Sequence, residues 1–588
     1  MPSWSSPMAR LLFAIPLLFV AACVQAPPGT PVPPSPTAGP IEVQVLGIND
    51  FHGNLEPPKT TVDATLPGGA IAKIPVGGVA YLATAAQSLR NGHPRSVTVS
   101  AGDMVGASPL VSSLFLDEPA IEAMEEVGVE FNAVGNHEFD RGSAELVRLQ
   151  SGGCAQHTMR KPCVVEPFDG ADFQFLAANV RASSGRTLFP GTAIKDFGDV
   201  QIGIIGMTLK ETASLVTPAG VAGLTFEDEA ATVNAAIPAL KAAGADAILV
   251  LIHQGGRTTG GYNDKSCPGL DGDIMPIIAR LDPAVDLVVS GHTHYAYVCH
   301  IARTAGRPLL LTSAGRYGTM ISDIRLQFDA EGRLQHSSAD NILVQGEGFA
   351  GPGGQVPVHP AFPVFARHPA TAALVDKYTA AALPLTQRVV GSLDGPITKE
   401  ANEDRELTGG NFIADAQLAA TRQLGAQIAF SNTGGVRADI VPGKGGAVTF
   451  GQIFAMQPFG NSLVVLTLSG AQLKALLEQQ FDSGTNTVAR PNMLLPSEGF
   501  RFAYDLSRPA GERIVDMRLH GRRIVPTATY KVTVVNFLAS GGDNFSVLKG
   551  ASAVVDANIL DVDATEAYLK AGGNVPSLGR IDDRTPRS

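Results

Sequence analysis

The stretch FNAVGNHEFDRG, residues 131–142, places a group of polar side chains directly behind a short apolar run. Residues 131–134 have the composition of a short buried strand. An amide, an imidazole and two carboxylates follow, from Asn136, His137, Glu138 and Asp140. These side chains do not stabilise an apolar core, because buried polar groups cost free energy unless they find partners. The stretch therefore predicts a strand that ends at a functional site.

From residue 41 onward, short β-rich runs like that at 131–134 alternate with helical patterns. The β-rich runs cover residues 41–48, 96–101, 131–134, 174–180, 200–207, 246–252 and 285–290. Helical patterns lie between several of them, for example over 78–92 and 229–244. This alternation predicts an α/β domain with a central sheet that is buried on both faces.

The chain of 588 residues is too long for one hydrophobic core, so we expect at least two domains. A Gly/Pro-rich break covers 346–363, a helical stretch follows at about 364–383, and the rest is richer in β-strand signals. We predict a first domain over 41–345, a linker and hinge helix over 346–385, and a second domain over 386–588. Within the first domain, we interpret the segment 141–200 only as a surface loop.

The first 23 residues are expected to be a signal peptide. Their apolar run LLFAIPLLFVAA (11–22) is too short to span a bilayer, and Cys23 follows two small residues. This resembles a bacterial lipoprotein signal, and a Pro-rich tether follows over 24–40. An ordinary secretory signal is the alternative. We expect an exported lipoprotein, periplasmic or at the cell surface, anchored to the membrane through Cys23. Val24 favours the outer membrane.

Four further cysteines fit export: Cys154, Cys163, Cys267 and Cys299. Four cysteines allow three pairings, and an oxidising compartment favours disulfides over free thiols. We expect Cys154–Cys163, which closes a short loop, together with Cys267–Cys299.

The net charge of −11, without any basic stretch, argues against a stable nucleic-acid partner. A small anionic substrate is still compatible with this charge, because a local metal or arginine cluster can override it. The oligomeric state is left open by the sequence.

Five expected strand ends carry acidic, amide or imidazole side chains. In an open α/β sheet, ligands bind outside the carboxyl ends of the strands, so these side chains should converge. Each motif alone is weak, because Asp-x-His can cap a turn and one histidine can belong to a core. Five of the twelve histidines lie at such positions, which independent placement explains poorly. The candidate ligands are Asp50, His52, Asp103, Asn136, His253, His292 and His294.

These residue types suit two first-row divalent ions, with Zn²⁺ or Mn²⁺ favoured. Two ions about 3.5–4 Å apart need a bridging carboxylate, and Asp103 is the candidate. Asp50, His52 and His294 would complete one site. Asn136, His253 and His292 would complete the other.

Two neighbours of Asn136 are candidate catalytic residues. His137 would face the substrate, and Asp140 would orient its ring and hold its charge. Such a pair stabilises developing charge or protonates a leaving oxygen. Glu138 is interpreted as structural.

The order D-x-H, GD, GNH, His and GH-x-H resembles the calcineurin-type metallophosphoesterase superfamily over residues 41 to about 345. Four later motifs resemble the C-terminal domain of the 5′-nucleotidase family: TGGNFIADA (408–416), FSNTGGVRADI (430–440), MQPFGNSLVVLTLSG (456–470) and NFLASGGDNF (536–545). The resemblance implies a four-layer α/β/β/α metallophosphoesterase domain, joined by a helix to a smaller α+β substrate-binding domain. Some members of the family carry Gln or Asn where this chain has His294.

The resemblance also implies substrate-binding roles in the second domain. Two aromatic rings match a pair that stacks on the base, with core packing as the alternative. A carboxylate matches the group that accepts hydrogen bonds from the ribose, and an amide and two guanidinium groups match other substrate contacts. The two aromatic rings are those of Phe459 and Phe537, and the carboxylate is that of Asp543. The amide is that of Asn432, and the two guanidinium groups are those of Arg437 and Arg405.

The implied function is removal of the 5′-phosphate from nucleotides such as AMP, by hydroxide that two metal ions activate, with UDP-sugars as further candidate substrates. One alternative is a 2′,3′-cyclic-nucleotide phosphodiesterase/3′-nucleotidase. Those relatives tend to have GGGN where this chain has GGDN, and Asp543 would repel a phosphate there. A thiosulfate-ester hydrolase ranks third. A non-catalytic metal-binding surface lipoprotein is the remaining alternative, and the intact His137–Asp140 pair argues against it.

Overall fold

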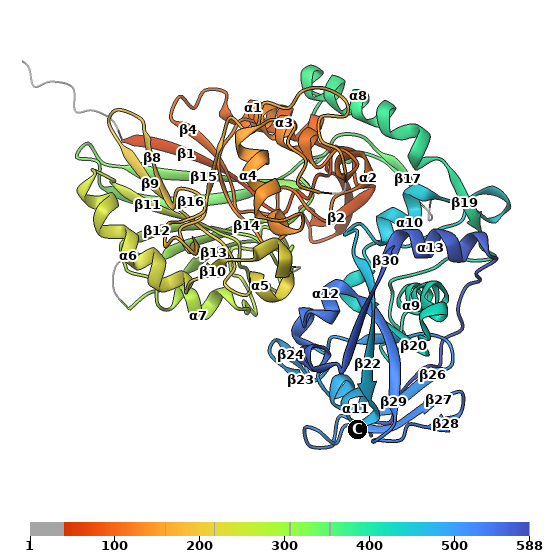
Figure 1. The fold of residues 1–588 in the computed structure, drawn as a ribbon. Coiled ribbons are helices and arrows are strands. Elements are labelled where there is room, and N and C mark those ends of the chain that lie inside the picture. The colour runs from red at the N-terminus through yellow and green to blue at the C-terminus, as the bar shows by residue number, and fades with distance from the viewer. Residues whose placement is uncertain (1–39, 159, 217, 305–306, 352–353, 587–588) are drawn as a thin grey trace, which may run out of the picture. The chain divides into compact units, whose positions relative to one another are not determined.

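The structure is a computed structural model that describes residues 40–586, apart from residues 159, 217, 305–306 and 352–353 (Figure 1). The predicted signal peptide, Cys23 and the tether up to residue 39 lie outside the described residues. None of the helices in the described ranges is long and apolar enough to cross a membrane.

The first region contains two six-stranded sheets. One sheet has the strand order β16 (Leu334–Leu343), β15 (Met320–Phe328), β1 (Ile41–Ile48), β4 (Ser96–Ser100), β5 (Val129–Ala133) and β6 (Gln174–Leu176). Strands β1, β4, β5 and β6 are parallel, whereas β15 and β16 run antiparallel. The parallel strands therefore end at one common edge.

The second sheet has the order β13 (Ala296–Ile301), β14 (Leu309–Ala314), β12 (Val285–Ser290), β11 (Ala247–Ile252), β9 (Gln201–Met207) and β8 (Thr192–Asp196). Strands β9, β11, β12 and β14 are parallel, and the two edge strands are antiparallel. An apolar core that includes Val45, Val99, Leu249 and Val289 fills the space between the sheets.

Helices cover the outer faces of both sheets (Figure 1). Helices α1 (Val79–Arg90) and α3 (Glu118–Val127) pack on the first sheet, where Val79, Leu82 and Ile121 share a core with Leu46. Helices α6 (Glu229–Ala242) and α7 (Ile274–Ile278) pack on the second sheet. The order helix, sheet, sheet, helix is the predicted four-layer α/β/β/α arrangement.

Helix α8 (Pro369–Thr386) lies close to the helical stretch expected at about 364–383. Its residues Val375, Tyr378 and Ala382 are buried in the core under α1 and α3. The helix that follows the first region in the chain is therefore packed firmly on that region.

The second region is built around a five-stranded sheet with the order β25 (Leu494–Pro496), β20 (Ile428–Asn432), β29 (Thr529–Val535), β22 (Ser462–Ser469) and β30 (Ala553–Leu560). A four-stranded sheet adds β28 (Arg522–Arg523), β27 (Ile514–Leu519), β26 (Phe500–Tyr504) and β31 (Ile581–Asp583). The associated helices are α9 (Thr408–Thr421), α10 (Phe450–Met456), α11 (Gly470–Glu478), α12 (Asn536–Ala539) and α13 (Asp561–Lys570). This is the α+β composition that the sequence predicted.

Local sequence signals explain where two of these helices begin. Thr449 with Gln452, and Ser469 with Gln472, form capping boxes at the starts of α10 and α11. In each box the side chains satisfy backbone N–H groups that have no partner inside the helix.

Two predictions about the first region need correction. The segment 141–200 is not merely a loop, because it contains α4 (Ser143–Ser151), β6, β7 (Val180–Ala182) and β8. The expected strand over 174–180 is divided between β6 and β7. Asn179 lies at the break, and its side-chain amide donates to the carbonyl of Thr208, which ties this loop to the end of β9.

The two expected disulfides are confirmed. Cys154 is bonded to Cys163, and Cys267 is bonded to Cys299. The second disulfide joins the loop after β11 to strand β13.

Candidate functional site

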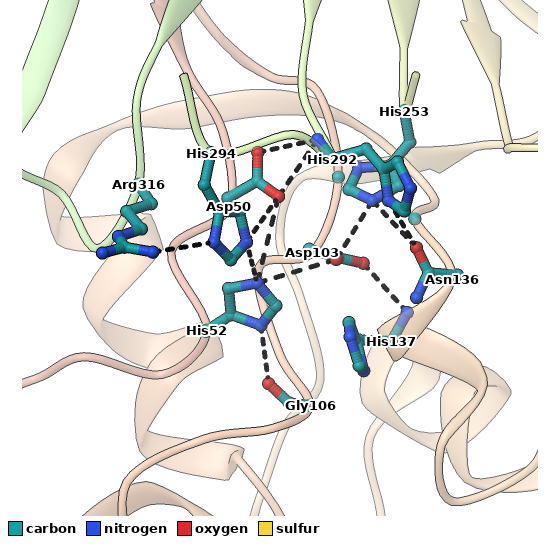
Figure 2. Close-up of polar contacts among 12 residues, drawn as sticks. Asp50, His52, Asp103, Gly106, Asn136, His137, His253, His292, His294 and Arg316 are labelled. Carbon is teal, nitrogen blue, oxygen red and sulfur yellow. Dashed lines mark hydrogen bonds and ion pairs between the residues drawn. The ribbon is translucent and has the colours of Figure 1, made fainter. Parts of the chain in front are cut away.

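All seven predicted metal ligands converge at the carboxyl ends of β1, β4, β5, β11 and β12 (Figure 2). In the first group, His52 Nε2 lies 3.1 Å from His294 Nε2. The carboxylate of Asp50 lies 3.4 Å from the same nitrogen of His294. These three side chains can each direct one ligand atom at a common metal ion.

The second group lies beside the first. His253 Nε2 is 3.0 Å from Asp103 Oδ2 and 3.1 Å from Asn136 Oδ1. His292 Nδ1 is also 3.1 Å from Asn136 Oδ1. Asp103, His253 and His292 can share a second metal ion, and Asn136 adds an amide oxygen to this group.

Asp103 lies between the two groups. Its Oδ2 atom is 3.0 Å from His253 Nε2 and 3.6 Å from His52 Nε2. A carboxylate in this position can reach both candidate metal sites, which is the geometry expected of a bridging ligand.

Backbone carbonyls orient two of the imidazoles. His52 Nδ1 lies 2.9 Å from the carbonyl of Gly106, and His253 Nδ1 lies 2.8 Å from that of Ala101. When Nδ1–H donates to a carbonyl, the lone pair of Nε2 is directed at the cluster, as is usual for histidines that bind metals.

Five of the seven residues have a left-handed backbone, with positive φ angles at Asp50, His52, Asp103, His292 and His294. This conformation is unfavourable for residues other than glycine, and such strain is concentrated at functional sites in proteins. Only glycine fits at position 135, because a Cβ atom there would lie 2.2 Å from Asp103 Oδ1.

The electrostatics of the cluster fit a pair of cations. Burial lowers the pKa of His52 to about 3 and that of His292 to about 4, so both rings are neutral as metal binding requires. Burial opposes a charge on His253, but Asp103 and Asp50 outweigh it and raise its pKa to about 10. Without a metal, the buried carboxylates thus hold a proton on His253, and a cation can take its place. Imidazole, carboxylate and one amide are suitable ligands for divalent ions of the first transition row.

His137 and Asp140 form the expected pair. His137 Nδ1 lies 2.9 Å from Asp140 Oδ2, and the backbone N–H of His137 donates to Asp103 Oδ1 at 2.9 Å. Burial opposes the charge on His137, but Asp140 and Asp103 raise its pKa overall. The ring is therefore fixed beside the candidate metal sites with Nε2 available.

Glu138 holds the loops together. Its carboxylate accepts hydrogen bonds from the backbone N–H groups of Asp103, Met104 and Gly135, at 3.0, 2.7 and 2.7 Å. These bonds connect the loop after β4 to the loop after β5, which agrees with the structural role inferred from the sequence.

A cavity of about 210 Å³ connects this cluster with the second region of the chain. Its lining includes four predicted residues of the first region, namely Asn136, His137, Asp140 and His292. It also includes five predicted residues of the second region, namely Asn432, Arg437, Phe459, Phe537 and Asp543. Residues that are far apart in the sequence thus line one cavity.

Aromatic and charged side chains are stacked in this cavity. The ring of Phe459 is stacked on His137, with 5.9 Å between ring centroids and 14° between ring planes. The guanidinium group of Arg437 lies over Phe459, 5.5 Å from the ring centroid. Asn432 Nδ2 donates to Asp543 Oδ2 at 2.7 Å, which fixes the carboxylate at the cavity wall.

Arg405 is the one predicted substrate residue that is absent from the lining of this cavity. Its guanidinium donates to the hydroxyl of Tyr504 at 2.9 Å and lies 3.5 Å from Asp583. The structure therefore does not bring Arg405 together with the other residues of this set.

Sequence reasoning missed several residues at the site. Leu215 and Val216 line the cavity from the region of helix α5 (Thr212–Leu215), and Asn461 lines it from the loop after α10. Arg316 lies 3.3 Å from His294 Nδ1 (Figure 2). The motif that contains Phe459 also contains Asn461, so that residue could have been found, whereas Leu215 and Val216 have no distinguishing pattern.

Comparison with known proteins agrees with the geometry. The sequence model of the family described as Calcineurin-like phosphoesterase matches residues 43–296. The model described as 5'-nucleotidase, C-terminal domain, matches residues 389–550. The two matched ranges contain all seven candidate metal ligands and the five cavity residues of the second region.

Individual relatives cover most of the chain. The chain is 29% identical over 537 residues to Endonuclease YhcR of Bacillus subtilis (strain 168), a match that covers 90% of this chain but only 40% of that protein. It is 26% identical over 571 residues to the 5'-nucleotidase of Bos taurus, with coverage of 91% and 89%. The crystal structure of a 5'-nucleotidase precursor from Thermus thermophilus is similar, with a TM-score of 0.71, 29% identity, and coverage of 92% of this chain and 99% of that chain.

The two family matches occur in the same order as the two regions of the fold. Together with the related 5'-nucleotidases, they show that this chain belongs to the 5′-nucleotidase family of metallophosphoesterase hydrolases, with a calcineurin-like N-terminal domain and a 5′-nucleotidase C-terminal domain.

Proposed function

We propose that this protein is an exported, metal-dependent hydrolase that removes the 5′-phosphate from nucleotides. The observation that carries the proposal is the shared cavity, in which Asn136 and His292 of the metal cluster face Phe459 and Phe537 of the second domain. A nucleoside monophosphate has a phosphate at one end and a flat base at the other, which matches these two walls.

Asp50, His52, Asp103, Asn136, His253, His292 and His294 would hold two divalent ions, with Zn²⁺ or Mn²⁺ favoured. Two such ions would polarise the phosphoryl group and make water acidic enough to act as a nucleophile near neutral pH. The chain itself fixes where this happens, because the five strand ends determine the positions of all seven side chains.

His137 is proposed as the catalytic side chain, with Asp140 as the residue that orients it. The protonated ring can stabilise negative charge on the phosphoryl group or donate a proton to the leaving 5′-oxygen. Arg437, over the ring of Phe459, adds a further positive charge near His137. The two groups would bind the substrate phosphate together with the metal ions, because they line the same cavity as Asn136 and His292.

The second domain would recognise the nucleoside. Stacking of a base on Phe459 and Phe537 is worth about 1–3 kcal/mol for each contact and tolerates different bases. Asp543, held by Asn432, would accept hydrogen bonds from the ribose hydroxyls. The role predicted for Arg405 remains a prediction, since it lies outside this cavity.

AMP-like monophosphates are the favoured substrates, and UDP-sugars are further candidates. The carboxylate of Asp543 would repel a phosphate attached to the ribose edge, which ranks a 3′-nucleotidase or cyclic phosphodiesterase below a 5′-nucleotidase. The name 5'-nucleotidase of the bovine and Thermus relatives supports the same order.

Export rests on separate observations. Both expected disulfides are present, and disulfides persist mainly in oxidising compartments. The Thermus relative is named a precursor, which agrees with a removable leader. We propose a lipoprotein anchored through Cys23, periplasmic or at the cell surface, with the outer membrane favoured.

The proposal is tested by release of inorganic phosphate from AMP, UDP-glucose, 3′-AMP and 2′,3′-cAMP, with Mn²⁺ or Zn²⁺ supplied to the purified chain. We expect AMP to be cleaved fastest and chelation to abolish the reaction. Preference for 3′-AMP or 2′,3′-cAMP would favour the alternative phosphoesterase, and no release from any substrate would favour the non-catalytic alternative.

The His137→Ala variant separates catalysis from metal binding. We expect a loss of about 100-fold or more in AMP hydrolysis, the lower end of what general acid–base groups contribute, with unchanged metal content. His336→Ala is the matched control, because His336 is exposed on β16. An unchanged rate in His137→Ala would remove His137 from the mechanism.

A further inference from the structure

The cavity of about 210 Å³ described above, in which we place the nucleotide, is called the nucleotide cavity from here on. A second cavity of about 450 Å³ adjoins it and shares Asp140 and Phe459 with it. One of its walls is formed by the loop that the Cys154–Cys163 disulfide closes, through His157, Thr158 and Arg160. The proposed 5′-nucleotidase reaction gives this loop no role.

The loop is held in place by contacts beyond its disulfide. The backbone N–H of Cys163 donates to Glu118 at 3.0 Å, and Arg148 donates to the carbonyl of Gly153 at 2.9 Å. Arg160 donates to the carbonyl of Ser113 at 3.2 Å, and its guanidinium lies 5.1 Å from the ring centroid of Phe454. The position of Arg160 at the cavity is therefore built into the fold.

Two guanidinium groups meet at this wall. Arg141 also donates to the carbonyl of Ser113, at 3.3 Å, so the two arginines share one acceptor. Burial, together with the like charge of Arg141, lowers the pKa of Arg160 to about 10. The wall is therefore a region of crowded positive charge.

Nearby carboxylates balance this positive charge only in part. Asp117 is ion-paired with Arg141, and Asp140 lies 2.9 Å from His137. Asp117 and Asp563 attract Arg160 only at longer range, and Asp563 is shared with Arg388. Over the described part of the chain, Arg160 forms no ion pair. An anion in the cavity would supply the missing partner.

Asp140 adds a carboxylate to the lining, where it is paired with His137, and the other walls are compatible with an anion. Gly142, Ser143 and Ala144 bring the first turn of α4 to the cavity. Gly142 makes no side-chain cap there, and the positive end of a helix dipole favours a negative group. Phe454, Pro458 and Leu560 add apolar side chains to the lining, which strengthens any charge pairing by excluding water.

We propose that this second cavity binds a phosphoryl group through Arg160, Arg141 and His157, directly beside the nucleotide cavity. Two sources have the same chemistry: a second phosphoryl group of the nucleotide that occupies the first cavity, or a separate inorganic phosphate ion. The first source rests on the proposed nucleotidase function, and the second does not. In either case, a loop outside the metal cluster adds an anion subsite to the enzyme.

Binding of radiolabelled inorganic phosphate to the metal-free full-length chain, measured by equilibrium dialysis, tests the site without any hydrolysis. We expect Arg160→Gln to weaken this binding by about tenfold or more, and Arg160→Lys to retain part of it because the charge remains. Arg186→Gln is the matched control, since it removes one exposed arginine from the same region and should leave binding unchanged.

A kinetic comparison then separates the two sources. If the phosphoryl group belongs to the substrate, Arg160→Gln should lower kcat/KM for ADP about tenfold while kcat/KM for AMP stays within about twofold. If the site takes free phosphate, both values should stay the same while binding in dialysis is lost.

The proposal is overturned if Arg160→Gln binds phosphate as wild type does. It is equally overturned if Arg160→Gln and Arg160→Lys lower AMP turnover and phosphate binding together with a loss of folded protein, because Arg160 would then be only structural. Absence of AMP hydrolysis by the wild type would refute the proposed function and leave the dialysis result valid. His157→Gln, in the exposed part of the loop, provides a milder variant and should weaken binding without loss of stability.

Discussion

Asp103 is the residue whose carboxylate lies between the two candidate metal groups. It is almost completely buried, and its carboxylate reaches His253 at 3.0 Å and His52 at 3.6 Å. Despite the cost of burial, the charges of His253 and His137 lower its pKa well below the usual value, so it is a carboxylate. Both metal sites should therefore depend on this side chain.

The Asp103→Asn variant should lose metal and activity together. An amide supplies one neutral oxygen in place of a shared carboxylate, so we expect fewer than two metal ions per chain by mass spectrometry. AMP turnover should fall by about 100-fold or more, at or beyond the range seen when partners of metal ligands are removed. Asp340→Asn, which removes an exposed carboxylate paired with Lys265, should retain both properties. Full metal content in Asp103→Asn would refute the bridging role.

Phe537 gives a test of the nucleoside wall. It lines the cavity from α12, and its ring lies against Gly542, where a Cβ atom would be 2.4 Å from the ring. Phe537→Leu keeps an apolar side chain but removes the face on which a base can stack. KM for AMP should rise by about 5- to 150-fold, corresponding to about 1–3 kcal/mol, with little change in kcat.

Phe450→Leu is the control for Phe537→Leu. Phe450 packs on the same core but does not line the nucleotide cavity, so its substitution should leave KM unchanged. Equal effects of both substitutions would mean that the aromatic rings act through packing rather than through the base.

At the scale of single elements, helix α13 contains an acid that opposes folding. Asp561 is the first residue of α13 and is buried, and burial raises its pKa to about 7. Hydrogen bonds from Val562 and Asn461 offset this cost only in part. Asn461 also lines the proposed nucleotide cavity, so this acid lies directly behind one wall of that cavity.

The sign of the pH effect follows from this raised pKa. The folded protein binds the Asp561 proton more tightly than the unfolded chain, so the free energy of unfolding should fall as pH rises from about 4 to about 7. Asp561→Asn should remove this loss, which is at most roughly 4 kcal/mol for a shift of about three pKa units. Unfolding by urea at pH 5 and pH 8 measures the difference.

Asp582→Asn is the matched control for this pH effect, because Asp582 is exposed. We expect the gap between Asp561→Asn and wild type to grow from pH 5 to pH 8, and no such change for the control. A gap that is independent of pH would show that Asp561 does not titrate in this range.

The sequence predicted strands well where apolar runs end at a functional turn. Strands β1, β9, β11 and β12 lie within one residue of the expected ranges, because their continuous apolar runs are typical of strands buried on both faces. The prediction of one continuous strand over 174–180 was wrong. The chain breaks at Asn179, whose side chain donates to the carbonyl of Thr208 at the end of β9, and this contact lies far away in the sequence. Helix α4 was missed because it is short and begins without a polar cap.

At the scale of the whole molecule, the candidate site residues of the two domains were predicted from the sequence in different ways. The two candidate metal groups could be predicted from the sequence, because suitable residue types follow successive expected strands and parallel strands of a sheet end at one edge. The nucleoside wall could be inferred only through similarity to a family, since Phe459, Phe537 and Asp543 carry no pattern that distinguishes them from core or loop residues. Arg405, which was inferred in the same way, contacts Tyr504 and does not line the cavity, and its role stays a prediction.

The structure adds cavity walls that neither the sequence pattern nor the family similarity predicted. Leu215 and Val216 close part of the nucleotide cavity, and the disulfide loop with Arg160 forms the wall of the neighbouring one. Both depend on contacts between segments that are far apart in the chain, so no local signal marks them.

The most direct test of the central claim is anomalous X-ray diffraction from crystals of the chain soaked with Mn²⁺ and a non-hydrolysable phosphonate analogue of AMP. We expect two manganese peaks, one among Asp50, His52 and His294 and one among Asp103, His253 and His292. The phosphonate should lie beside both, with the adenine against Phe459 or Phe537. A single peak, peaks elsewhere, or a nucleotide bound away from this cavity would contradict the account.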